Sequence, residues 1–178
     1  VTSSVVISLI FVWMFAPQGI FNQITNLTVN WLDDPKYAFY VIMGMNIFTI
    51  RGTLMLIFLS GLQDISPTIY EAAQIDGADP IQIFFRITIP MLRPVIFFVV
   101  TVGVIGCFQV FDQIFVMTSG GPLDSTTTIT YLIYKWAFRD TTIKMGQASS
   151  LAVILTLIIL AITLIQRRVI EGSGSTTQ

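Results

Sequence analysis

The chain has 178 residues, of which 54% are hydrophobic and only 11% are charged, and its formal net charge is −1. Soluble domains carry about 25% charged residues, so this composition indicates a membrane protein. The absence of histidine and the single cysteine, Cys107, exclude internal disulfides, Cys/His metal sites and histidine acid–base catalysis within these residues. The sequence therefore predicts no catalytic set, no metal, no cofactor and no nucleic-acid partner.

Four apolar segments are predicted to be membrane helices, because a span needs roughly 20 mostly apolar residues. They are 1–15, 38–62, 94–116 and 148–166. The first is too short to cross alone, and we interpret it as the end of a span in an N-terminally truncated chain. The predicted fold is an all-α polytopic membrane helix bundle of about four spans, a single domain over 1–168 with a flexible tail at 169–178.

Three polar connections, 16–37, 63–93 and 117–147, join these spans. Lysine and arginine counts leave their sidedness undecided, because each side of the membrane would carry four basic residues. The last connection contains "TTTITYLIYKWAF", which at about 13 residues favours an interfacial helix over a span.

The 63–93 connection predicts two short helices. Ser66 and Asp79, each followed by proline, are typical N-cap residues of helices. Gln82 would complete a capping box with Asp79. Gly77 suits the left-handed turn that ends the first helix, and Pro90 and Pro94 are expected to end the second and lead into the next span.

Side-chain size in this segment leaves two interpretations open. Small side chains at Ala72 and Ala73 would let another protein approach closely, and Phe84 and Phe85 would be apolar anchors for it. Alternatively, the segment is an amphipathic loop that rests on the membrane surface.

The same segment resembles the EAA loop that marks the membrane subunits of ATP-binding-cassette importers. It has "EAA" at 71–73, Gly77 six residues after Glu71, and "ITIP" at 87–90, with Ile89 where the family usually has leucine. These motifs, together with "FVMTSGGP" at 115–122 and the "TTTIT" run, make the chain similar to the sugar-uptake branch of these importers. In that branch it resembles a maltose/glycerol-phosphate-type permease, the first of a permease pair, with a type I importer core.

The resemblance implies that 63–93 is a cytoplasmic coupling loop and that 16–37 and 117–147 are external. In that family the short helix of the loop sits in a cleft of the ATPase subunit. The coupling residues implied are Glu71, Ala72, Ala73, Asp76, Gly77, Phe84, Ile87 and Pro90. The chain has no G-x-x-x-x-G-K-[ST] phosphate loop, so it is not expected to be an enzyme, and ATP hydrolysis would reside in a separate subunit.

The implied assembly is a binding-protein-dependent sugar importer in a bacterial or archaeal inner membrane. Its other members would be a second permease, two ATP-binding subunits and an extracytoplasmic solute-binding protein. Two alternatives remain open: an importer of glycerol-3-phosphate or another anionic polyol, and a membrane scaffold that does not transport.

Polar side chains inside spans are costly and are therefore functional candidates. Two predicted spans carry three each at helical spacing: Asn46, Thr49 and Thr53, and Gln109, Asp112 and Gln113. Because these spans are antiparallel, Asn46 and Gln109 can lie at one depth and face one cavity, with Phe48 and Phe108 available to stack on a sugar ring. Alternatively, the polar groups only hydrogen-bond neighbouring helices.

Family members of the maltose type line their sugar site at positions that match this chain. The matching residues are Asn46, Phe48, Thr49, Ile50, Thr53, Cys107 and Gln109. Ile50 and Cys107 differ from the smaller or more polar residues of a maltose site. Arg51, in the middle of a span, would neutralise a cargo phosphate or pair with an acid on another chain. Five glycines in the spans are expected to allow close helix packing: Gly44, Gly52, Gly61, Gly103 and Gly106.

Overall fold

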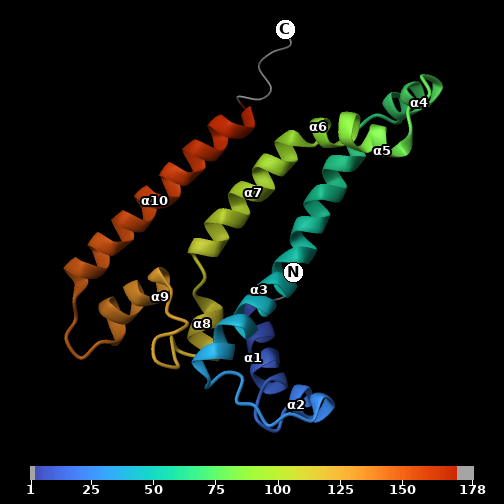
Figure 1. The fold of residues 1–178 in the computed structure, drawn as a ribbon. Coiled ribbons are helices and arrows are strands. Elements are labelled where there is room, and N and C mark those ends of the chain that lie inside the picture. The colour runs from blue at the N-terminus through green and yellow to red at the C-terminus, as the bar shows by residue number, and fades with distance from the viewer. Residues whose placement is uncertain (1–2, 172–178) are drawn as a thin grey trace. The chain divides into compact units, whose positions relative to one another are not determined.

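The computed structural model describes residues 3–171, and every regular element in that range is a helix (Figure 1). The α-helices are α1 (Ser4–Met14), α2 (Ile20–Thr25), α3 (Pro35–Gln63), α4 (Pro67–Ile75), α5 (Pro80–Ile83), α6 (Ile89–Met91), α7 (Arg93–Phe108), α8 (Asp112–Met117), α9 (Ile129–Tyr134) and α10 (Met145–Glu171). Two π-helical turns complete the set, η1 (Phe84–Thr88) and η2 (Lys135–Arg139). The all-α class predicted from the sequence is confirmed.

Within the described residues, three segments are long and apolar enough to cross a membrane: Pro35–Gln63, Arg93–Met117 and Met145–Arg168. Between 6% and 17% of the residues in their most apolar windows are buried within the chain. Most of their apolar surface is therefore left for lipid or for other proteins. The 11 residues of α1 extend only about 16 Å, which is shorter than the hydrocarbon layer.

One compact unit consists of the residues up to Arg51 and of Ile105–Ile159. In it, α1 packs along α8, and the two lie side by side in Figure 1. The buried core comes from α1, α3, α8 and α9 and consists of Ile7, Val41, Ile42, Met45, Ile114, Met117 and Tyr131. Because Tyr131 is only 1% exposed, α9 belongs to this core and does not merely rest on a surface.

Asn22 fixes the connection between α1 and α3 in the same unit. Its side-chain amide donates to the carbonyls of Pro17 and Val29 at 3.0 and 2.8 Å, and its oxygen accepts from Trp31 Nε1 at 2.6 Å. The Trp31 ring also meets the Phe21 ring edge-on, 5.1 Å between centres. A buried amide with three partners holds this loop in one conformation.

The second unit consists of Gly52–Val104 and of α10 from Leu160 onward. In it, α10 is joined to α7 by a polar contact, in which Gln166 Nε2 donates to Thr101 Oγ1 at 2.9 Å. The connection between α3 and α7 holds the short helices α4, α5 and α6 (Figure 1).

The helix expected to end at Pro90 and Pro94 ends between them, and Pro90 itself does not stop it. The chain continues from α5 through η1 into α6, with a turn only at Leu92 before α7 begins. In η1 the N–H of Ile89 donates to the Phe84 carbonyl, five residues back. This wider π-helical turn leaves room for the Pro90 ring, which lacks an N–H and would crowd a regular α-turn.

The expected capping box is also wrong. Ser66 and Asp79 do occupy the N-cap positions of α4 and α5, but neither side chain accepts a hydrogen bond from its helix. The Ser66 hydroxyl instead contacts the Thr68 hydroxyl at 2.8 Å. Asp79 is exposed, so water competes for its carboxylate.

Two predicted boundaries differ from the structure. The helix expected over 94–116 is interrupted at 109–111, between α7 and α8. Of the tail expected to be flexible over 169–178, the residues up to Glu171 belong to α10, and 172–178 lie outside the described residues.

Close packing by glycine occurs at Gly61. A Cβ built there would lie 2.6 Å from Val95 Cγ2 and 3.2 Å from Leu92 Cδ2, so α3 and α7 meet at this glycine. At Gly44, Gly52 and Gly103 no described atom lies within 4 Å of such a Cβ.

We predict that Gly61→Ala destabilises the protein by about 1–3 kcal/mol, because the β-branched Val95 side chain cannot move aside freely. Gly52→Ala, in the same helix, is the matched control. The melting temperatures of the two purified variants are compared with that of the wild type. Equal melting temperatures for both variants would contradict close packing at Gly61.

Candidate functional site

A polar cavity of about 250 Å³ lies in the first unit, between α1, α3 and the interrupted end of α7. Its polar lining consists of Ser4, Asn46, Thr49, Gln109, Asp112 and Gln113. Five of the six residues that the sequence predicts as two polar helix faces therefore come together here. The sixth, Thr53, belongs to the other unit.

An amide pair forms part of the cavity wall. Gln113 Nε2 donates to Asn46 Oδ1 at 3.1 Å, which connects α8 to α3 across 67 residues of sequence. Both side chains are half-buried. After this bond the pair still has N–H donors and a carbonyl acceptor to offer, which is the combination that a hydroxyl-rich molecule can bind.

A second, mostly apolar cavity of about 320 Å³ adjoins the first, since Asn46, Ile50, Gly106 and Val110 line both. Cys107, predicted for the substrate pathway, lines this apolar cavity and not the polar one.

Phe48 and Arg51 contact each other. The Arg51 guanidinium carbon lies 4.2 Å from the centre of the Phe48 ring, and Phe11 packs on the same ring at 6.0 Å between centres. This cation–π contact is a third arrangement, beside the two that the sequence left open for Arg51. Phe48 and Phe108 line neither cavity. The signal in the sequence for the contact between Phe48 and Arg51 is that they lie three residues apart on one helix.

The 63–93 loop has a well-defined turn between its helices. Gly77 adopts φ +78°, its N–H donates to the Gln74 carbonyl, and the Ala78 N–H donates to the Ala73 carbonyl, both at 3.0 Å. This pair of bonds is a Schellman motif, which caps α4 and requires the left-handed conformation that glycine adopts at low cost.

Buried contacts connect α4 to the helices that follow it. Ala73, Ile83 and Thr88 are buried, and the Tyr70 and Thr88 hydroxyls lie 3.3 Å apart. The hydroxyl contact between Tyr70 and Thr88 thus joins α4 to η1.

The outer side of the loop is apolar. Ile75, Ile81, Phe84 and Phe85 are 86%, 66%, 51% and 63% exposed, and the two phenylalanine rings stack edge-to-face at 5.2 Å. Exposed side chains of this kind, gathered on one loop, mark interaction surfaces. The remaining predicted coupling residues are exposed at Glu71, Ala72, Asp76 and Gly77 and half-buried at Ile87 and Pro90.

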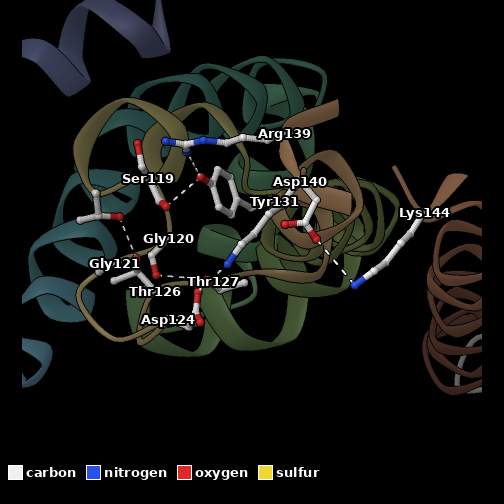
Figure 2. A network of polar contacts seen from close by, with 12 residues as sticks. Ser119, Gly120, Gly121, Asp124, Thr126, Thr127, Tyr131, Arg139, Asp140 and Lys144 are labelled. Atoms are coloured by element: carbon white, nitrogen blue, oxygen red, sulfur yellow. Dashed lines mark hydrogen bonds and ion pairs between the residues drawn. The ribbon is translucent and has the colours of Figure 1, made fainter. Parts of the chain in front are cut away.

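The connection before and through α9 is held by a polar network, shown in Figure 2. Tyr131 lies at its centre: its hydroxyl donates to the Ser119 carbonyl at 2.7 Å and accepts from Arg139. Gly120 has φ +84°, and a Cβ there would lie 2.7 Å from both the Tyr131 ring and Thr127 Oγ1. Sequence reasoning missed this network, and the adjacent glycines at 120–121 were its only local signal.

An exposed ion pair completes the network. Lys135 Nζ lies 3.1 Å from Asp124 Oδ1, and the hydrogen bond from Lys135 and its charge lower the pKa of the Asp124 carboxyl below its usual 3.8. The stabilisation is fully present above the unfolded-state pKa and is lost as the pH falls through the lowered folded-state pKa. The contact is therefore constant over the neutral range and weakens only in strong acid.

The family pattern described as "Binding-protein-dependent transport system inner membrane component" matches residues 1–172. The chain belongs to this family of membrane subunits.

Two curated relatives show how its members differ. The chain is 34% identical over 174 residues to the lactose transport system permease protein LacF of Rhizobium radiobacter, covering 93% of this chain and 58% of LacF. It is 34% identical over 166 residues to the sn-glycerol-3-phosphate transport system permease protein UgpA of Pectobacterium atrosepticum, covering 89% of this chain and 56% of UgpA. The chain thus spans little more than half the length of these relatives.

The fold is similar to that of a solved membrane protein chain. The crystal structure of a bacterial ABC transporter involved in the import of the acidic polysaccharide alginate matches with a TM-score of 0.84 at 23% identity. The match covers 97% of this chain and 62% of that chain. At this identity the likeness shows the fold alone.

We predict that Gly120→Ala loosens the 118–139 connection, because the new methyl group collides with Tyr131 and the backbone conformation disfavours any Cβ. A cost of about 2–3 kcal/mol would speed protease cleavage in this connection by roughly 30–150-fold, if opening equilibrates before cleavage. Gly146→Ala, where no described atom lies within 4 Å, is the control. Equal cleavage of both variants would show that the network does not depend on this turn.

Proposed function

We propose that the chain forms half of the translocation pathway of an ATP-driven sugar importer and couples to a separate ATPase subunit through the 63–93 loop. The observation that carries this proposal is the loop itself: a helix capped by a Schellman motif, joined to η1 by the Tyr70–Thr88 contact, with exposed large apolar side chains. A loop of this design suits insertion of α4 into a cleft of another protein.

The connectivity supports a mechanical link. Three residues, 64–66, separate the end of α3 at Gln63 from the start of α4 at Pro67, and one residue, Leu92, separates the end of α6 from the start of α7. Asn46 lies on α3, and Gln109 directly follows α7. Movement of α4 by an ATPase would thus be transmitted along two continuous helices to the residues that line the polar cavity.

The partners under this proposal are a second permease, two ATP-binding subunits and a solute-binding protein. The apolar surfaces of the candidate spans, which this chain leaves largely unburied, support a second membrane subunit. The alginate transporter that is similar in fold has been solved with an alginate pentasaccharide-bound periplasmic protein, which supports a binding protein for this chain.

A neutral sugar fits the described lining of the polar cavity better than an anion does. The lining offers amides and hydroxyls together with the carboxylate of Asp112, which would repel a phosphate. Arg51, the cation that an anionic cargo would use, lies over Phe48. Import of an anionic polyol such as sn-glycerol-3-phosphate is therefore the second candidate.

The cargo prediction is tested in the assembled importer, reconstituted in lipid with its ATPase and binding proteins. We expect ATP hydrolysis to rise with a neutral sugar such as lactose, and Asn46→Leu to abolish most of that rise while basal hydrolysis is unchanged. Stimulation by sn-glycerol-3-phosphate instead would favour the second candidate. Hydrolysis indifferent to every ligand would contradict the transport proposal.

The coupling prediction uses Gly77 in the same preparation. Gly77→Val forces a β-branched residue into φ +78° and should lower cargo-stimulated hydrolysis at least tenfold by displacing α4. Gly77→Asn is the matched control, because asparagine tolerates the left-handed conformation. Full coupling in the valine variant would contradict the role given to this loop.

A further inference from the structure

The candidate span Arg93–Met117 is interrupted near its outer end. α7 stops at Phe108 and α8 starts at Asp112, while Phe111 lies outside the helical region at φ −132° and ψ −59°. The last carbonyls of a helix have no partner within the helix. In a hydrocarbon environment such carbonyls must find donors elsewhere, because no water is available.

Two threonine hydroxyls supply those donors. Thr130 Oγ1 donates to the Phe108 carbonyl at 3.0 Å, and Thr128 Oγ1 donates to the Val110 carbonyl at 2.8 Å. Thr128 is the N-cap residue of α9 and Thr130 lies in its first turn, about 20 residues further along the chain. The interruption is therefore closed by side chains from another element.

Thr128 has a second contact. Its hydroxyl accepts a hydrogen bond from the Tyr131 N–H at 3.3 Å and so caps the first turn of α9. One hydroxyl thus acts as donor to the interrupted span and as acceptor for α9, which joins both to the buried Tyr131.

The start of the same threonine run is fixed as well. Thr126 donates to the Gly121 carbonyl at 2.7 Å, and Thr127 donates to the Gly120 carbonyl at 3.1 Å. All four hydroxyls of "TTTIT" therefore donate to backbone carbonyls, two in the turn drawn in Figure 2 and two at the interruption.

The interruption lies at the polar cavity. Gln109 belongs to it, and Asp112 and Gln113 follow directly after it; all three line the cavity. Gln113 reaches Asn46 only in the direction that α8 takes after the interruption. Whatever fixes the backbone at 108–111 also fixes where these amides lie.

We propose that Thr128 and Thr130 are positioning residues, which hold the interruption between α7 and α8 through their hydroxyls and thereby set the positions of Gln109 and Gln113 in the cavity. Without these hydroxyls the segment relaxes toward a continuous helix, whose own N–H groups would serve the same carbonyls. The amide pair with Asn46 is then lost.

Cys107 provides a direct readout, because it precedes Phe108 and lines the apolar cavity of which Thr126 and Thr128 form part of the wall. The experiment measures how fast a water-soluble maleimide alkylates Cys107 in the full-length protein, assembled in lipid, by mass spectrometry of its peptide. Cys107 is exposed. We expect the Thr128→Val/Thr130→Val double variant to react about fivefold faster, since the cavity that Cys107 lines loses part of its wall when Thr128 detaches, and it opens further to water and reagent. The double serine variant, which keeps both hydroxyls, should stay within about twofold of the wild type.

Thr156→Val is the matched control, because the Thr156 hydroxyl donates to the Ala152 carbonyl of its own helix at 2.9 Å. An unchanged Cys107 rate in the double valine variant overturns the proposal, and so does equal acceleration in the serine variant or in Thr156→Val. If the double valine variant does not assemble, the single valine variants decide. Wild-type rates in both would show that the threonines only stabilise the fold.

The consequence for cargo rests on the proposed function and is measured separately. In the reconstituted importer, the double valine variant should need about tenfold more of the stimulating sugar for half-maximal ATP hydrolysis, with basal hydrolysis unchanged. If no cargo stimulates even the wild type, the proposed function fails, whereas the Cys107 rates still decide the positioning role. A raised Cys107 rate with an unchanged cargo requirement would overturn the link to the cavity.

Discussion

The constraint on which this structure depends is that a backbone carbonyl inside a membrane must find a hydrogen-bond donor. An uninterrupted helix meets it automatically, but the span at Arg93–Met117 is interrupted at 109–111. Thr128 and Thr130, at the start of α9, donate to carbonyls at the interruption, and Tyr131 in the same helix is buried. The polar cavity therefore exists where irregular backbone is supported by side chains from elsewhere in the unit.

The 63–93 loop and the connection through α9 are stabilised in different ways. The 63–93 loop is compact through its backbone, with a left-handed glycine and a π-helical turn that accommodates proline, and it presents apolar side chains outward. The connection through α9 is compact through side-chain hydrogen bonds and an exposed ion pair. Under the proposed function the first surface meets an ATPase and the second faces the side from which cargo arrives. α3 and α7 are the continuous elements that lead away from the loop.

Sequence reasoning predicted what depends on composition and on local backbone preference. Apolar length gave the helical class, and Gly77 gave the end of α4, because glycine is the residue that adopts φ +78° at low cost. It failed where distant residues decide the local structure. Proline at position 90 predicts the end of a helix, but the π-helical turn η1 accommodates it. The apolar run 94–116 predicts one helix, but Thr128 and Thr130 donate hydrogen bonds to the carbonyls at its interruption. The polar residues of the cavity were found for a partly incorrect reason: Gln109 and Gln113 share a wall, although they do not share one continuous helix.

The most direct test of the account is an experimental structure of the assembled importer with a sugar trapped inside, determined by electron cryomicroscopy. The account predicts sugar density within hydrogen-bond distance of Asn46 and Gln113, an interrupted span held by Thr128 and Thr130, and α4 seated in the ATPase. A continuous helix over 93–117, with the sugar bound away from this amide pair, would contradict it.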